Sequence, residues 1–144
     1  MRGIGSISPG WGVTAVRIAM GLILFIAGYG KVSAGVAGVT EAFTGMGVPL
    51  PGVTAPFVMV LELVGGALLL VGLAGRWVGL LFAIQFAYIT FLLKLPADGW
   101  GAARLDVMLL AGAILMVLAG SGRASLDAVW LERERGPAGG RRAL

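Results

Sequence analysis

The sequence contains neither cysteine nor histidine, and only 12% of its 144 residues are charged. Without cysteine the chain cannot form a disulfide, a thiolate metal site or a thiol relay. Without histidine it cannot ligate haem through imidazole or build a Ser–His nucleophile. We therefore expect no haem, no metal and no disulfide. Charged residues make up about 25% of an average globular protein, so the low share here argues against a soluble domain.

Long apolar segments take the place of the missing polar residues. Hydrophobic residues make up 58% of the chain. A run of about 15 to 19 apolar residues forms a helix long enough to cross a thin bilayer. The predicted spans cover about residues 13–30, 55–73, 77–95 and 104–120, and Pro96 is expected to end the third. The sequence therefore predicts an all-α integral membrane protein, a four-transmembrane-helix bundle.

Two shorter regions complete the predicted organisation. The link after the first span is too apolar for an exposed loop and too rich in Gly and Pro to span, so we expect a short interfacial helix at about 36–44 that covers the outer face. After the last span, Ser125 can cap a helix from Leu126 to about Arg135. We expect one membrane domain over residues 1–135 and a disordered basic tail over 136–144.

The basic residues indicate the orientation of the bundle. With four spans, both tails share one side, and that side holds most of the arginines, whereas the other side holds Lys31, Lys94 and Arg104. By the positive-inside rule we expect both termini in the cytoplasm. Arg17, one turn inside the first span, suits a retained anchor better than a cleaved leader. The net charge of +4 lies at the membrane edges, which indicates contact with lipids and no nucleic-acid partner.

Glu62 is the most informative single residue, because it interrupts the apolar run of the second span. An ionisable side chain inside a membrane costs a few kcal/mol on insertion scales, so it marks a candidate functional site. Depth favours Lys31 over Arg17 as its partner. Glu62 and Asp106 are the candidate catalytic residues. The candidate ligand-binding residues are Lys31, Lys94 and Arg104, which converge with the two carboxylates on the outer half of the bundle, Tyr88 at a similar level, and Gln85 near the midplane.

Glycines accompany these polar residues at helical spacing. Gly65 and Gly66 share the helix face of Glu62, where they either allow close approach of another helix or leave space for a ligand. In the first span one stripe carries Arg17, Gly21, Leu24, Gly28 and Lys31. Packing alone would also explain both sets, so the glycines do not decide between a binding site and a helix contact.

The order of these residues resembles a known family pattern. The run Arg17-x-x-x-Gly21…Gly28-x-x-Lys31 resembles the first helix of the DoxX family of small bacterial membrane proteins. The match continues through three further motifs: Phe43-x-x-Met46-Gly47-Val48-Pro49, Glu62-x-x-Gly65-Gly66…Gly72-x-x-x-Arg76, and Asp106 followed by Gly122-Arg123-x-Ser125-Leu126-Asp127. The resemblance covers about residues 15–130. It implies a multi-pass protein of the bacterial inner (plasma) membrane. It also implies structural or motif roles for Arg17, Gly65, Gly66, Arg76 and Asp127.

The resemblance also implies a function. Family members are similar to the membrane subunit of a thiosulfate:quinone oxidoreductase or to accessory subunits of membrane redox complexes. This implies a quinone as cofactor, a small anion such as thiosulfate, and a protein partner or a second copy of the chain. The sequence has no second, soluble-facing part, so it is at most an oxidoreductase subunit that acts with a partner.

Three functional hypotheses follow and stay open at this point. In a quinone-linked subunit, the outer cations attract the anion while Glu62 or Asp106 relays protons. In a non-catalytic scaffold, Glu62 only pairs with a cation. In a small proton-coupled transporter, Glu62 carries the proton, and Glu62→Gln would abolish flux.

Overall fold

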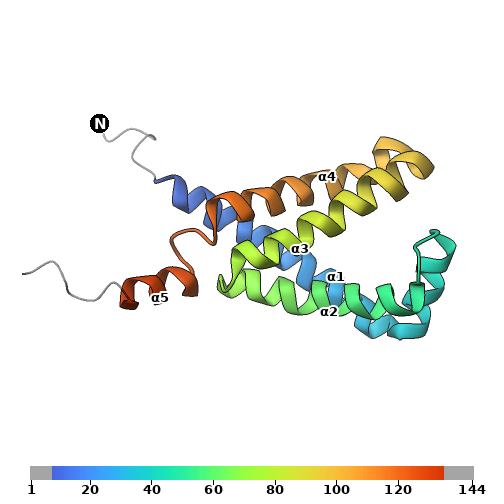
Figure 1. Ribbon diagram of the computed structural model, residues 1–144, viewed down its shortest axis with the longest axis horizontal. Helices are drawn as coiled ribbons and strands as arrows, with labels where there is room; N and C mark the ends of the chain where they lie inside the picture. The colour runs from blue at the N-terminus through green and yellow to red at the C-terminus, as the bar shows by residue number, and fades with distance from the viewer. Residues whose placement is uncertain (1–7, 135–144) are drawn as a thin grey trace, which may run out of the picture.

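The computed structural model describes residues 8–134, and every regular element in this range is a helix. The elements are α1 (Pro9–Gly45), α2 (Pro51–Val71), α3 (Gly75–Tyr88), the π-helical segment η2 (Ile89–Lys94), α4 (Leu95–Ala119) and α5 (Leu126–Glu134) (Figure 1). Three stretches in this range are long and apolar enough to cross a membrane: Pro9–Gly45, Pro51–Val71 and Gly75–Ala119. The predicted all-helical class is confirmed. The predicted disordered tail, 136–144, lies outside the described residues.

Helices α1 and α2 lie side by side along much of their length (Figure 1). Glycines allow this contact. A Cβ atom at Gly66 would lie 2.5 Å from the backbone nitrogen of Phe25, and one at Gly21 would lie 3.0 Å from the carbonyl oxygen of Gly66. No side chain fits between the two backbones, as is common where membrane helices associate through small residues. The predicted stripe on α1 is buried at Arg17, Gly21, Leu24 and Gly28.

The third and fourth predicted spans follow one another without a long loop and are separated at Gly99. The prediction that Pro96 ends the third span is wrong. Pro96 lies in the first turn of α4, directly after the π-helical turn of η2. Proline is tolerated in a first turn, and a π-helical turn relaxes the regular hydrogen-bond ladder around it. The break is instead at Gly99, whose φ of 70° favours glycine. There the chain turns back, so that α4 lies along α3 (Figure 1).

A second glycine bends α1. Gly35, at φ 81°, interrupts the helix, and the part that follows continues to Gly45. Val39 and Phe43 of this last part pack against Ala55 and Met59 of α2 in a small apolar cluster of their own. The helix expected at about 36–44 is therefore present as the end of α1, folded onto α2.

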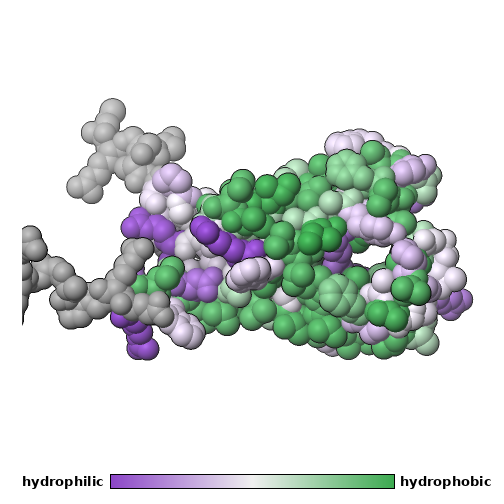
Figure 2. Space-filling view, viewed as in Figure 1, coloured by the Kyte–Doolittle hydropathy of each residue, from purple (hydrophilic) through white to green (hydrophobic). Residues whose placement is uncertain are grey.

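The main core lies where all four long helices meet, and it is small. It is centred on Leu24, Leu69, Phe82 and Met116, with Phe82 and Phe86 stacked at a centroid distance of 6.0 Å. Many other large apolar side chains point outward instead of inward. Figure 2 shows this as a hydrophobic body, with hydrophilic residues gathered at the end that carries α5. Such a surface is stable in lipid rather than in water.

Candidate functional site

A cavity of about 580 Å³ lies between the α1–α2 pair and the α3–α4 pair, at the end away from α5. We call it the lateral cavity. Figure 2 shows the surface hollowed at this end. Apolar side chains make up most of its wall, and the end of α1 closes it through Phe43 and Met46. The polar side chains that line it are Lys31, Thr54, Glu62, Gln85, Tyr88, Lys94 and Asp106.

Glu62 connects three helices in the wall of this cavity. Its carboxylate is 5% exposed and forms an ion pair with Lys31 of α1. Its second oxygen accepts a hydrogen bond of 3.0 Å from Gln85 Nε2 of α3. Both carboxylate oxygens are therefore engaged, which offsets the cost of burying the charge. The predicted choice of Lys31 over Arg17 as partner is confirmed.

Asp106 and Lys94 form a second ion pair in the same wall. The carboxylate of Asp106 is 6% exposed, and its Oδ2 lies 2.6 Å from Lys94 Nζ. At this distance the ammonium group occupies Oδ2 as its ion-pair partner. It joins η2 to the early part of α4. Each helix pair thus contributes one lysine and one carboxylate to the lateral cavity.

One buried acceptor on a cavity-lining residue, Gln85 Oε1, has neither a hydrogen-bond partner nor an ion-pair partner among the described residues. The orientation of the Gln85 amide is fixed by Glu62, because a carboxylate can only accept and therefore selects the NH₂ group. A buried acceptor without a donor costs about 1–3 kcal/mol. A ligand with a hydroxyl group would supply the missing donor, so the lateral cavity suits such a ligand.

The other predicted ligand-binding residues are placed differently. Tyr88 lies one helical turn after Gln85 and lines the lateral cavity with it. Arg104 is exposed and does not line the cavity, because on α4 the buried face carries Ala103 and Asp106. Gly65 and Gly66 pack against neighbouring helices, with Gly65 facing Phe82 of α3. In the described structure these two glycines form helix contacts rather than ligand space.

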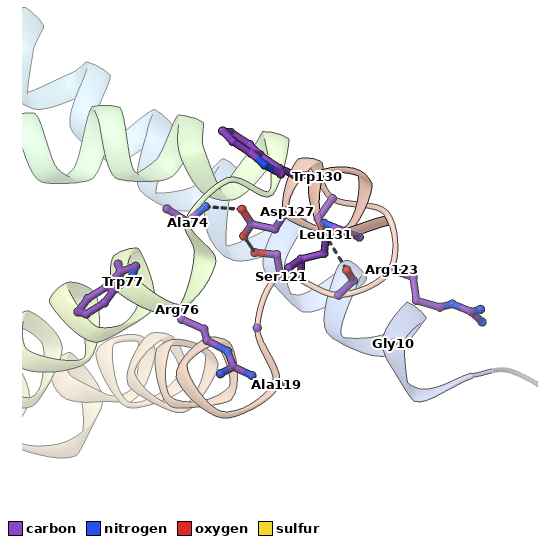
Figure 3. Close-up of a pocket in the computed structure, with 14 residues that line it drawn as sticks. Gly10, Ala74, Arg76, Trp77, Ala119, Ser121, Arg123, Asp127, Trp130 and Leu131 are labelled. Atoms are coloured by element: carbon purple, nitrogen blue, oxygen red, sulfur yellow. Dashed lines mark hydrogen bonds between the residues drawn. The ribbon is translucent and has the colours of Figure 1, made fainter. Parts of the chain in front are cut away.

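A second polar cluster lies at the opposite end, around Asp127 of α5. We call it the polar hub. The Asp127 carboxylate accepts hydrogen bonds from the backbone nitrogens of Ala74 (2.9 Å) and Gly75 (3.2 Å) and from the Ser121 hydroxyl (Figure 3). Its own backbone N–H donates to the carbonyl of Gly72 at 3.1 Å. One carboxylate therefore holds the first turn of α3 and the start of α5 together.

Arg17 completes the polar hub from α1. It is only 2% exposed, and its guanidinium donates to the carbonyl oxygens of Ser121 and of Ala124, the latter at 2.7 Å. Burial raises the pKa of the Asp127 carboxyl. Hydrogen bonds from Ser121, Ala74 and Gly75, together with the nearby charge of Arg17, outweigh this and hold the pKa of Asp127 below its ordinary value.

Sequence reasoning placed Asp127 in the first turn of its own helix, which is confirmed, but it missed the contact with α3. The carboxylate lies 53 positions from the Ala74 nitrogen that it accepts from. No local sequence pattern indicates such a contact. A non-glycine residue in a left-handed turn is visible only in the structure, where Ala74 has φ 53°. The polar hub fixes the fold, whereas the lateral cavity offers volume and an unused acceptor, Gln85 Oε1.

Comparison with known proteins places the chain in a family. The family model described as DoxX matches residues 12–95. The chain is 36% identical over 116 residues to the Bacillus subtilis (strain 168) protein named "Putative oxidoreductase CatD", covering 81% of this chain and 84% of that protein. It is 33% identical over 120 residues to "Inner membrane protein YqjF" of Escherichia coli (strain K12), covering 81% and 89%. No solved structure matches the chain significantly. The chain belongs to the DoxX family of membrane proteins.

Proposed function

We propose that this protein is a quinone-linked subunit of a membrane redox complex, and that the lateral cavity holds the quinone head group. The observation that carries the proposal is the buried, unpartnered acceptor Gln85 Oε1 on the lining of an apolar cavity that also holds two lysine–carboxylate ion pairs. The name of the Bacillus subtilis relative, an oxidoreductase, supports a redox role. When bound, a quinone supplies two-electron, two-proton chemistry.

The residues of the cavity fit such a head group. Lys31, Lys94 and Tyr88 can donate hydrogen bonds to carbonyl oxygens, and Gln85 Oε1 can accept a hydrogen bond from a hydroxyl of the reduced form. The volume of about 580 Å³ falls in the range of roughly 300–1,000 Å³ that small-molecule sites occupy. Mostly apolar walls with a few polar groups are typical of such sites.

The charges favour a neutral ligand. Lys31 pairs with Glu62 and Lys94 pairs with Asp106, so the two positive and two negative charges of the cavity cancel. Arg104, the third outer cation, is exposed and outside the cavity. An anion such as thiosulfate would have to displace a carboxylate from its lysine. In this proposal the anion is handled by a partner protein, and the cavity serves the quinone.

The ligand enters from the bilayer. Phe57 of α2 and Leu81 and Ile84 of α3 line the cavity and are also 58%, 45% and 62% exposed on the apolar surface. A wall that is both cavity lining and outer surface is a lateral opening, here between α2 and α3. This route suits a molecule dissolved in lipid.

Within the cavity, the ion pairs position the groups that exchange protons. The oxygens of Glu62 and Asp106 are the sites at which a proton is held or passed on. Lys31 and Lys94 fix the two carboxylates in place and neutralise them when they are ionised. Gln85 orients Glu62 from the third helix.

The proposal includes a topology. We propose that α3 with η2 and α4 cross separately, because the chain reverses at Gly99, which makes four crossings in one membrane domain over residues 1–135. Both termini then lie in the cytoplasm of the bacterial cell, and the end of α1 after Gly35 lies at the outer interface. The arginines at the α5 end, Arg76, Arg123 and Arg133, support this arrangement.

The test is the quinone content of protein solubilised mildly from its own membrane. The variant is Glu62→Gln, and the matched control is Glu41→Gln, which removes an exposed carboxylate of α1 outside the cavity. We expect stoichiometric quinone in the wild type and in the control. In Glu62→Gln we expect a quinone content lower by roughly tenfold or more, because a hydrogen bond to a charged group contributes about 1.5–3 kcal/mol. Absence of quinone from the wild type, or equal content in all three, would contradict the proposal.

A non-catalytic scaffold is the second candidate. The full engagement of Glu62 by Lys31 and Gln85 favours it, because a structural carboxylate needs no other partner. In that case the wild type carries no quinone, and Glu62→Gln lowers the melting temperature or the yield of a co-purifying partner.

A further inference from the structure

A second cavity, of about 810 Å³, lies at the α5 end of the molecule. It is bounded by the start of α1, the link between α2 and α3, the end of α4 and helix α5 (Figure 3). It does not overlap the lateral cavity, and the proposed quinone function does not involve it. We call it the basal cavity.

The rim of the basal cavity carries uncompensated positive charge. Arg76 and Arg123 line it, both are exposed, and the ion pairs found among the described residues involve neither. Asp127 also lines it, but both of its oxygens accept hydrogen bonds within the polar hub. The buried charge of Arg17 balances that of Asp127. The net charge of the rim therefore comes from the two arginines.

Figure 3 shows that the arginines do not point at Asp127. Arg76 lies beside the end of α4 near Ala119, and Arg123 extends past Gly10. The contacts agree: a Cβ atom at Gly120 would lie 3.4 Å from Arg76 Nε, and one at Gly10 would lie 2.6 Å from the Arg123 stem. The two arginines therefore flank the basal cavity on opposite sides, and both side chains are exposed.

Aromatic residues accompany the arginines. Trp77 is 74% exposed and Trp130 is 63% exposed, and both line the basal cavity. Trp at this position is typical of the membrane–water interface, where the ring meets the upper part of the acyl chains. An occupant that matches both features has an anionic group and an apolar tail.

We infer that the basal cavity binds the anionic head group of a phospholipid, with Arg76 and Arg123 flanking the head group from two sides and Trp77 and Trp130 against the acyl chains. Guanidinium groups bind phosphate oxygens in a bidentate manner, and basic pockets at the cytoplasmic ends of membrane helices select anionic lipids. With the proposed topology, this end faces the anionic cytoplasmic leaflet.

The test is native mass spectrometry of the full chain in detergent, titrated with phosphatidylglycerol and, separately, with phosphatidylcholine. The variants are Arg76→Gln and Arg123→Gln. The control is Arg133→Gln, which removes an exposed charge from α5 at the same end but outside the cavity. We expect each cavity variant to bind phosphatidylglycerol about fivefold more weakly, the effect of about one basic contact, while the control stays within about twofold. Phosphatidylcholine should bind weakly to all.

Three results would overturn the inference. Equal losses in the variants and the control would show diffuse attraction to a positive surface rather than a site. Equal binding of the two lipids would show that the anionic charge is not recognised. Displacement of the lipid by millimolar inorganic phosphate would assign the site to a free anion. If Arg76→Gln does not fold, Arg76→Lys replaces it, and we expect weaker binding than in the wild type because a lysine cannot contact phosphate in a bidentate manner.

Discussion

Both ends of the molecule bury charged groups, but they use them differently. In the polar hub, backbone groups satisfy the charges: Arg17 donates to two carbonyls, and Asp127 accepts from two backbone N–H groups. In the lateral cavity, side chains satisfy the charges of Glu62 and Asp106, and one acceptor, Gln85 Oε1, stays unused beside an open volume. Charged side chains that bond to backbone atoms hold the path of the chain in place. Charged side chains that pair with each other beside a cavity remain available to a ligand.

The largest loss of stability is expected from a substitution that introduces a steric clash into the polar hub. Gly72 has φ 74°, and a Cβ atom there would overlap Arg17 Nη1 and lie 2.5 Å from the Ser125 Cβ. Strain and overpacking together should lower the free energy of unfolding of Gly72→Ala by roughly 2–5 kcal/mol. Thermal unfolding followed by circular dichroism measures it. The control is Gly12→Ala, at a helical position with open space around it, and this variant should be as stable as the wild type or slightly more stable. Similar melting temperatures for both variants would show that the hub is not tightly packed.

Removing the hub carboxylate should have the next largest effect. Asp127→Asn loses the charge that three donors share, and we expect a loss of about 2–4 kcal/mol in the free energy of unfolding. Glu132→Gln, on the same helix and exposed, is the control and should change stability little.

Asp127→Asn should also change how the stability of the protein depends on pH. The pKa of Asp127 is lower in the folded state than its ordinary value, so its stabilisation is present above about pH 4 and is lost as the pH falls through the folded pKa. The wild type should lose stability in that acid range, and Asp127→Asn should lack this component. Parallel pH profiles of the two proteins would refute the assignment.

At the lateral cavity, a charge-neutral change should leave the fold intact. Lys31→Met with Glu62→Gln removes both charges of one ion pair, while the amide oxygen introduced at position 62 can still accept from Gln85. Replacing a buried pair by neutral groups is often close to neutral, so we expect a change in stability within about 1 kcal/mol. Chemical denaturation in mixed micelles measures it. A loss as large as that of Asp127→Asn would mean that the cavity charges hold the fold as the hub charges do.

The smallest change in stability is expected from Ala74→Gly in the polar hub. Ala74 adopts φ 53°, which glycine tolerates better, while its N–H is held by Asp127. Ala74→Gly should raise the melting temperature slightly, by the equivalent of up to about 1 kcal/mol. A clear drop would show that the turn is not strained.

Much of this architecture could be predicted from periodicity and depth. The pairing of Lys31 with Glu62 follows from the depth of each residue in its own span, and the shared face of Gln85 and Tyr88 and the helix after Ser125 follow from helical spacing and capping within single segments. These are local properties of the chain, and the sequence contains them directly.

The remaining features depend on contacts between distant segments. The chain has 25 glycines, and nothing local distinguishes Gly35 and Gly99, where the helices bend, from glycines that stay helical. The contact of Asp127 with the first turn of α3 needs two links to meet in space. The exposure of Arg104 follows from the rotation of α4 about its axis, which its neighbours set.

The central claim is that the cavity charges serve a ligand and the hub charges serve the fold. The most direct measurement is the melting temperature of the wild type, Lys31→Met/Glu62→Gln and Asp127→Asn, with and without a short-chain quinone. A ligand that binds only the folded state raises the melting temperature. We predict that Asp127→Asn melts lower but keeps the quinone-induced rise, and that the double variant melts normally but loses it. A rise that persists in the double variant, or that disappears in folded Asp127→Asn, would contradict the account.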